Sequence, residues 1–154
     1  MAQTFQVQGI LNLSANDTYT QLAVTTGLTG TDNTAFRIKE LLLEHPNLNT
    51  AAALVTSEVQ LTRGSKAALV DYSDTSLIIR DKRGVVGSAA GWFFQDNTKD
   101  FIPQSDLIIV ETQIFLGCKT TGTGAAAKYQ FKILFEEIKI SADQRIAILS
   151  SRLP

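Results

Sequence analysis

The hydrophobic pattern is strongest between Ala127 and Lys139, where apolar and polar residues alternate. Every second position of this segment holds a large apolar residue: Tyr129, Phe131, Ile133 and Phe135. Lysine and glutamine occupy most positions between them. Because successive side chains of a strand point to opposite faces, the segment predicts a half-buried strand with one solvated side. The phase changes at Glu136–Glu137, where we expect a β-bulge that restores the apolar pattern.

A second strong apolar segment, Leu107–Lys119, precedes this strand along the chain. The linker between them, Thr120–Ala126, contains two glycines and no large apolar residue. Such a linker between two strand patterns is typical of a hairpin. We therefore predict that the two segments pair as one long antiparallel hairpin at the centre of the fold.

Four further strand patterns occupy the N-terminal part of the chain: Thr4–Leu13, Tyr19–Thr26, Ala35–Glu44 and Val55–Arg63. The third is ambiguous, because its leucine and glutamate content favours a helix, whereas Phe36 and Ile38 alternate with basic residues. We assign it to a strand, because Pro46 follows closely and the neighbouring segments have strand patterns.

The middle of the chain gives mixed signals. We interpret Thr75–Lys82 as a brief helix capped by Ser73 or Asp74, with a strand through Leu77–Arg80 as the alternative. The next segment, Val85–Gln95, predicts a single strand with Gly91 at a bulge or close approach. It is followed by Asp96–Asp100, which has the polar composition of a turn.

Near the C-terminus, Ser141 and Gln144 have the spacing of a capping box, which predicts a short closing helix. Its apolar stripe comprises Ile146, Leu149 and Leu153. The remaining pattern is a series of short strands with turn signals between them, and their half-solvated alternation favours antiparallel over parallel sheets. Residues 1–154 are thus predicted to form one all-β domain, an antiparallel β-sandwich of the single jelly-roll type with a short C-terminal helix.

Composition narrows the functional classes. The chain is 44% hydrophobic and 19% charged with a net charge of −1, which argues against disorder and against strong binding to nucleic acid. A single cysteine excludes an intrachain disulfide and fits a reducing compartment. Residues Met1–Ala15 lack the pattern of a signal peptide, and no apolar run is long enough to span a bilayer.

The reactive residue types form no recognisable catalytic set. His45 is the only histidine, so a multi-histidine metal site or a histidine relay is excluded, and we interpret it as a turn residue. Cys118 lies in a strand pattern without a basic group placed to lower its pKa, which favours a small half-buried residue over a nucleophile. Glu136 and Glu137 are adjacent and should face opposite sides of a strand. We expect no catalytic residue, no metal site and no cofactor.

Two surface features remain. Five basic residues could form a patch, but an interspersed aspartate favours a solvated rim: Arg63, Lys66, Arg80, Lys82 and Arg83. The densest aromatic cluster places large rings on both faces of one strand: Trp92, Phe93 and Phe94. Such a cluster indicates core packing, a sugar-stacking platform or a subunit contact. We take these aromatic residues and the C-terminal apolar stripe as candidate subunit contacts.

Three segments carry a resemblance to a known family: VQLTRGSKAALVDYSDTSLI at 59–78, LIIVETQIFLGCKTTGTGAAAKYQFKILFEEIKIS at 107–141 and SADQRIAILSSRL at 141–153. Together they resemble the small single jelly-roll structural proteins of icosahedral viruses and their uncultured relatives. The resemblance lies in the pattern of these segments rather than in an invariant motif.

This resemblance implies a capsid subunit or another virion building block that is assembled in the host cytoplasm. Its partners would be further copies of the chain and other virion proteins, with no small-molecule substrate. Many coat proteins that bind a packaged genome have a basic N-terminal arm, whereas Met1–Ala15 contains no lysine or arginine. The alternative function is a carbohydrate-binding, lectin-like sandwich in which Trp92 or Tyr72 stacks on a sugar.

Overall fold

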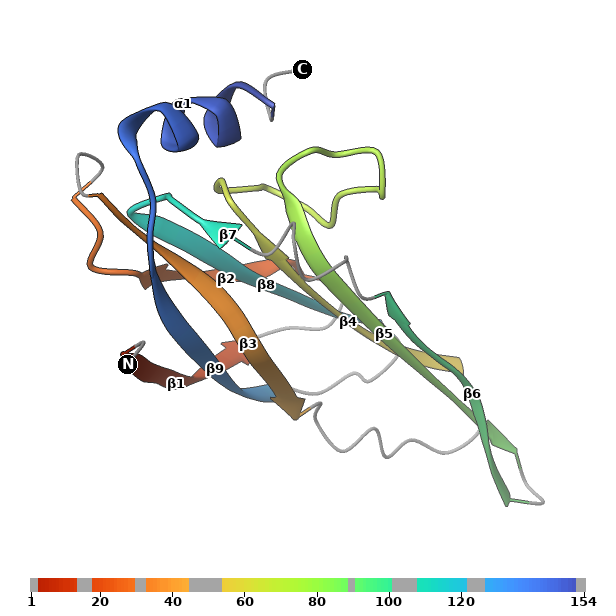
Figure 1. Cartoon of the computed structure of the whole chain (residues 1–154). Helices are drawn as coiled ribbons and strands as arrows, with labels where there is room; N and C mark the ends of the chain where they lie inside the picture. Colours follow the sequence, from red (N-terminus) through yellow and green to blue (C-terminus); the bar gives the residue numbers. More distant parts are fainter. Residues whose placement is uncertain are drawn as a thin grey trace.

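The computed structural model describes residues 3–13, 18–29, 33–44, 54–88, 91–100, 108–121 and 127–151, with the backbone alone for 43, 54–55, 83–88, 91–100 and 127. Their strands form two antiparallel sheets. The first sheet has the order β1 (Thr4–Leu13), β9 (Ala127–Lys139), β3 (Thr34–Glu44) and β7 (Ile108–Ile109). The second has the order β2 (Thr20–Thr25), β8 (Gln113–Thr121), β4 (Leu54–Thr62), β5 (Leu77–Ser88) and β6 (Gly91–Asp100). Helix α1 (Ala142–Ser150) follows β9 (Figure 1).

The strand pairing is nested. β1 pairs with β9, β2 with β8, β3 with β7 and β4 with β5, so early strands pair with late strands in reverse order. A chain folded back on itself in this way and wound over two packed sheets is a jelly roll. The predicted all-β antiparallel sandwich with a C-terminal helix is therefore confirmed. Beyond that core arrangement, β6 adds a strand beside β5, and their hairpin extends away from the sandwich (Figure 1).

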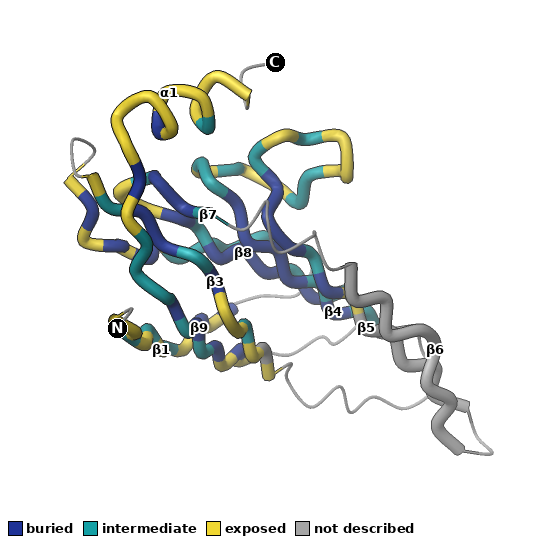
Figure 2. Tube along the Cα trace, in the orientation of Figure 1, coloured by how far each residue is buried: buried dark blue, intermediate teal, exposed yellow. Residues whose placement is uncertain are grey.

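The hydrophobic core lies between the sheets, where the tube in Figure 2 is dark blue, the colour of buried residues. The alternating residues of β9 face inward as predicted, and all four are at most 5% exposed: Tyr129, Phe131, Ile133 and Phe135. At one end, the ring centroids of Phe5 and Phe36 are 4.6 Å apart, and those of Phe5 and Phe135 are 5.0 Å apart. Aromatic rings at these separations add to the stabilisation from burial alone.

A buried polar contact joins the two sheets through Tyr129. Its hydroxyl, carried by β9 of the first sheet, lies 2.5 Å from Ser57 Oγ and 2.6 Å from Thr120 Oγ1, on β4 and β8 of the second. Burial raises the pKa of Tyr129, so the hydroxyl stays protonated at neutral pH. A phenol in the core is tolerated because it has these partners.

The predicted central hairpin is wrong. β8 pairs with β2 and β4, whereas β9 pairs with β1 and β3, so the two strongest strand segments lie in different sheets. The predicted strand Leu107–Lys119 is also two strands, because a bend at Glu111–Thr112 carries the chain from β7 in the first sheet to β8 in the second. Sequence alternation identifies a strand but not its partner, and both segments bury one face equally well in either arrangement.

The predicted bulge at Glu136–Glu137 is wrong as well. β9 keeps a continuous register there, and the register shift lies in β3, between Ile38 and Glu40. The change of phase has a different cause. Ile138 faces the outer side of the first sheet, where it packs with Ala35, Val110, Ile140 and Ile148 beneath α1. A helix covers that end of the outer face, so apolar residues are favoured on it.

In the middle of the chain, the predicted helix over Thr75–Lys82 is wrong and the strand alternative is correct, since β5 begins at Leu77. The predicted single strand Val85–Gln95 is interrupted between Ser88 and Gly91, where β5 ends and β6 begins. The predicted turn at Asp96–Asp100 belongs to β6. Pairing with β5 supplies the backbone hydrogen bonds that make a strand of this polar sequence.

The other predicted elements are confirmed. β1 to β4 coincide with the four N-terminal strand patterns, including the ambiguous third one, which pairs with β9 over nearly its whole length. Tertiary pairing thus overrides the helix propensity of its leucines and glutamates. Helix α1 begins with the predicted capping box, in which Ser141 Oγ accepts from Gln144 N and Gln144 Oε1 accepts from Ser141 N.

Candidate functional site

Helix α1 presents apolar residues to solvent. It is anchored by Arg145, which is 7% exposed and donates hydrogen bonds to the carbonyl oxygens of Val110 (3.0 Å) and Thr34 (2.6 Å). Ile146 and Leu149 of the predicted stripe are 62% and 45% exposed. Leu153 lies outside the described residues. The helix is therefore held by a buried arginine and leaves two large aliphatic side chains available for contact.

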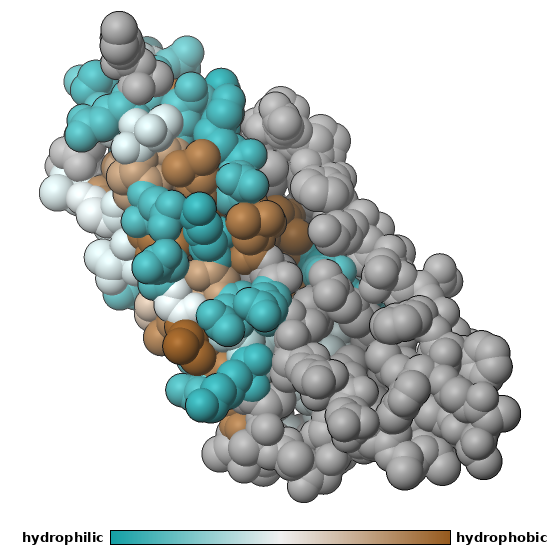
Figure 3. Space-filling view, turned by 90° about the horizontal axis from the view of Figure 1, so that it is seen from below, coloured by the Kyte–Doolittle hydropathy of each residue, from teal (hydrophilic) through white to brown (hydrophobic). Residues whose placement is uncertain are grey.

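The outer face of the first sheet carries two more exposed aliphatic residues away from the helix. Ile10 on β1 is 56% exposed and Leu42 on β3 is 49% exposed. On the same sheet, the carboxylate of Glu136 on β9 lies 3.4 Å from Arg37 Nη1 and 3.6 Å from Lys39 Nζ, both on β3. Figure 3, seen from below, shows hydrophobic residues set among hydrophilic ones over the described surface. This mixture of isolated apolar groups and ion pairs is typical of polar, hydrated contacts.

The predicted aromatic contacts lie on β6, the edge strand of the second sheet. In the register with β5, Trp92 is opposite Gly87, Phe93 opposite Val86 and Phe94 opposite Val85. The side chains of these three residues lie outside the described residues. Their role as subunit contacts stays a prediction.

The outer face of the second sheet is organised around Gln60, a residue that sequence reasoning missed. Its buried side-chain amide donates to Tyr19 Oη (2.9 Å) and Ala68 O (3.0 Å) and accepts from Val70 N (2.9 Å). Tyr19 lies directly over Gly117, where a Cβ atom would be 1.9 Å from the hydroxyl. Only glycine fits beneath this ring. A polar residue at an outward position of a strand gives no sequence signal for such burial.

The segment 63–76 is a hydrogen-bonded loop over this face. Asp74 accepts hydrogen bonds from Ser76 and forms an ion pair with Lys66, whose Nζ lies 2.8 Å from Oδ2. These contacts, that of Lys66 foremost, lower the pKa of Asp74 to about 2. The amide of Gln21 also binds the loop, accepting from Lys66 N at 3.0 Å. The loop is thus held by side chains of its own and by the amides of Gln21 and Gln60 from the sheet.

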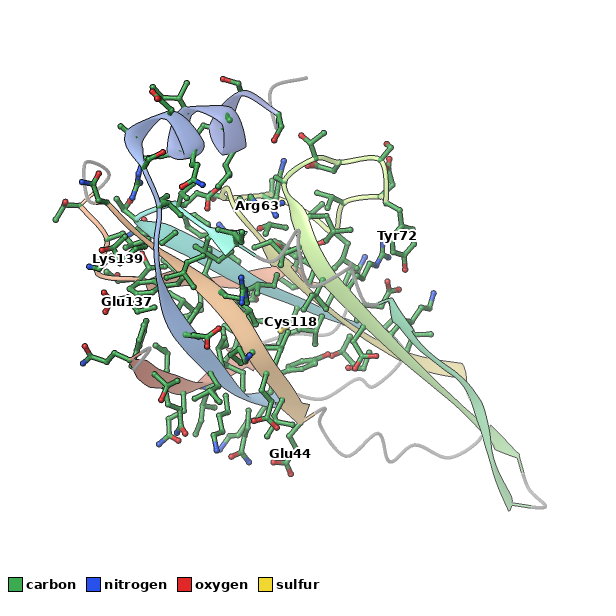
Figure 4. All side chains as sticks on the ribbon, viewed as in Figure 1. Glu44, Arg63, Tyr72, Cys118, Glu137 and Lys139 are labelled. Atoms are coloured by element: carbon green, nitrogen blue, oxygen red, sulfur yellow. The ribbon has the colours of Figure 1, made fainter. Side chains whose placement is uncertain are left out.

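Tyr72 stands out on this loop. Its ring is 61% exposed, and the Arg80 guanidinium carbon lies 5.5 Å from the ring centroid. Arg80 is held in turn by Glu58 and by Val70 O. Burial raises the pKa of Glu58, but hydrogen bonds and charge from Arg80 and Lys82 outweigh it and lower the pKa overall. Figure 4 places Tyr72 at the periphery, far from Cys118 in the interior.

The basic residues form a paired rim. Each of the four whose side chains are described has an acidic partner: Arg63 with Glu111 at 3.8 Å, Lys66 with Asp74 at 2.8 Å, Arg80 with Glu58, and Lys82 with Glu58 at 3.3 Å. Arg83 is described by its backbone alone. The four basic residues thus use three carboxylates, because Arg80 and Lys82 share Glu58.

The reactive residue types are dispersed. Cys118 is fully buried, and burial raises the pKa of its thiol well above the ordinary range. Glu136 and Glu137 fall on opposite faces of β9, as expected for neighbours in a strand. Within the described ranges, no group of three or more His, Cys, Asp or Glu side chains is placed to hold a metal ion. His45 lies outside them.

The fold and surface define a class: a jelly-roll β-sandwich with a capped C-terminal helix and exposed aliphatic residues on one side. No family model matches the chain, and no curated protein is significantly similar to it in sequence. In the part of the chain that the structure describes, no helix is both long and apolar enough to cross a membrane.

Proposed function

We propose that this protein is a non-enzymatic structural subunit of an icosahedral virion that assembles with copies of itself. One observation carries the proposal. Among the described residues, the exposed large aliphatic side chains lie on one side of the jelly roll: Ile10, Leu42, Ile146 and Leu149. The first two are on the outer face of the first sheet, and the other two are on the helix that covers its end.

The geometry suits a building block. A rigid sandwich with a helix locked in place by Arg145 offers a preformed surface, so little conformational entropy is lost when subunits associate. Isolated aliphatic groups among charges fit repeated, specific contacts in a closed symmetric shell. Its partners would be further copies and other virion proteins, in a virion assembled in the host cytoplasm. The sequence resemblance to viral jelly-roll proteins supports the same function.

A single charge on the helix tests the proposal. Ile146→Asp places a carboxylate on the exposed apolar side and should abolish particles in electron micrographs, while the urea midpoint of unfolding stays near that of the wild type. Ala142→Asp is the matched control, because it adds the same charge to an exposed residue at the N-terminal end of α1, where the helix dipole favours it. Particles that persist in Ile146→Asp would argue against the helix as a contact.

Substitution is the cleaner test, compared with deletion of residues 145–154. Arg145 is buried and binds two carbonyl oxygens, so its removal would affect folding as well as assembly. A wild-type protein that forms no particles under any condition would argue against the proposed function itself.

One observation favours a second candidate function, carbohydrate binding. Tyr72 is exposed on a loop fixed by hydrogen bonds, with Arg80 beside its ring, and an exposed aromatic ring next to a hydrogen-bond donor suits stacking on a sugar. A glycan screen on wild type and Tyr72→Ala would test it. Saturable binding that Tyr72→Ala abolishes, in a protein that stays monomeric, would favour this candidate over the first.

A further inference from the structure

Among the described strands, none pairs with the outer edge of β1, and one contact identifies the backbone groups that point to this edge. Glu137 N donates to Gln3 O at 2.8 Å, and these two residues are directly opposite in the β1–β9 register. Hydrogen-bonded and non-hydrogen-bonded pairs alternate along an antiparallel ladder. The odd residues of β1 therefore bond to β9, and the N–H and C=O groups of the even residues point to the other edge: Thr4, Gln6, Gln8, Ile10 and Asn12.

This edge lacks the features that usually prevent strand addition. β1 is 10 residues long, and it contains no charged residue, no proline and no register shift against β9. Natural edge strands are commonly protected by lysine, proline, bulges or short length. At the opposite edge of the same sheet, β7 has two residues and pairs only with Phe36 and Arg37 of β3. The rest of β3 carries charged residues and a register shift, features that protect an edge. Within the described residues, no strand pairs with the outer edge of β1.

We propose that β1 pairs antiparallel with β1 of a second copy of this chain, which joins two first sheets into one continuous sheet across a twofold axis. This inference deepens the proposed self-association, on which it rests, by naming the contact. The second copy is the partner that the strand itself fits, because an uncharged strand meets its own copy without like-charge repulsion. A twofold contact is also the simplest closed one.

The register follows from the edge groups. When Gln8 lies opposite Gln8 of the second copy, Gln6 lies opposite Ile10 and Thr4 opposite Asn12. All five residues with free edge groups then have partners. Gln6 Nε2 already donates to Gln8 Oε1 at 2.9 Å within one chain, so the glutamine side chains can extend this polar row across the axis.

The inward faces match in the same register. Phe5 lies opposite Leu11 of the second copy, and Val7 lies opposite Gly9. Phe5 and Val7 are only partly buried in the single chain, so pairing would remove further apolar surface from water. Apolar residues thus meet on the inner face, and on the outer face Gln8 meets Gln8, Thr4 meets Asn12 and Gln6 meets Ile10. A register that keeps the apolar face toward the core is the one that burial specifies.

A proline at the centre of the edge tests the contact. The N–H of Gln8 points away from β9, so Gln8→Pro removes an edge donor without breaking the β1–β9 ladder, and proline is tolerated at such positions. Each dimer loses two backbone hydrogen bonds, and we expect association to weaken by roughly 30-fold. Gln8→Thr is the control, because it changes the side chain, keeps the N–H and should leave association unchanged.

A cysteine cross-link gives a second readout that does not depend on the folding of the proline variant. Gln8→Cys would place two thiols across the axis at a separation that a disulfide can span. Mild oxidation should then give a covalent dimer in high yield. Gln130→Cys is the matched control, since Gln130 is exposed on the same face but lies on β9, inside the sheet. The native Cys118 is buried and does not compete.

The outcomes separate the two proposals. Efficient cross-linking through Gln8→Cys, with little through Gln130→Cys, supports the edge contact. An assembly that survives Gln8→Pro and cross-links equally through both cysteines overturns the edge contact but leaves self-association intact. A wild-type protein that remains monomeric at all concentrations, without a cross-link at position 8, overturns both.

Discussion

The outer faces of the two sheets differ in what covers them. On the second sheet, Gln60 is fully buried, because Tyr19 and the loop 63–76 lie over it. On the first sheet, α1 covers one end, and Ile10 and Leu42 are about half exposed. Around Gln60, the second sheet is therefore covered by its own chain, whereas the first sheet leaves apolar groups at the surface.

This difference bears on the surface that would take part in the proposed self-association. The cover of the second sheet is held by polar contacts, among them those of Lys66 with Asp74 and of Gln60 with Val70. The first sheet and its helix offer aliphatic residues and an unprotected edge strand, which are features of interaction surfaces. For the proposed self-association, we therefore expect contacts through the first sheet and its helix, and the aromatic cluster on β6 of the second sheet stays a separate candidate contact.

The largest expected effect separates the two faces of the first sheet. Phe131→Ala removes a ring from the core between the sheets and should lower the free energy of unfolding by about 3–5 kcal/mol. Lys132→Ala, next along the same strand but on the outer face, should change it by less than about 0.5 kcal/mol. Urea unfolding of both variants checks this. Equal losses would mean that the outer face is packed as tightly as the core.

A smaller effect should follow from opening the cover of the second sheet. Gln60→Ala leaves Tyr19 Oη, Ala68 O and Val70 N without their partner and should lower the free energy of unfolding by about 2–3 kcal/mol. Gln130→Ala, an exposed glutamine on the outer face of the first sheet, is the matched control and should be near neutral. Equal stability of Gln60→Ala and Gln130→Ala would contradict the proposed difference between the outer faces of the two sheets.

The smallest effect concerns pH and the loop of the second sheet. The folded-state pKa of Asp74 is lowered from 3.8 to about 2, so its carboxylate contributes stability above the higher value and loses it as pH falls through the lower one. Wild type should therefore be more stable than Asp74→Asn at neutral pH, and the difference should shrink as pH approaches 2. Urea unfolding at both pH values measures it. A difference that is independent of pH would contradict a role for the Asp74 charge.

Much of the fold could be predicted from alternation alone. The period-two patterns identified β1 to β4 and β9, and the spacing of Ser141 and Gln144 identified the helix cap. Pairing could not be predicted in the same way. β8 and β9 look like a hairpin in sequence because each buries one face, and only the long-range competition of β2, β4, β1 and β3 for their edges separates them into two sheets.

The candidate site was predicted in part. Ile146 and Leu149 were singled out as an apolar stripe, and the structure leaves both exposed. Arg145 and Gln60 were missed, because a buried polar residue is defined by distant carbonyl and amide partners that have no sequence signature. The free edge of β1 likewise depends on which strands pair with it, so it becomes visible only in the folded sheet.

The central claim is that this chain is a building block that associates through copies of itself. Multi-angle light scattering of the purified protein at neutral pH, over a series of concentrations, tests it most directly. The account predicts a mass well above the 16.8 kDa of one chain, falling toward that value on dilution or in Gln8→Pro. A mass that stays at 16.8 kDa at the highest concentration would contradict it.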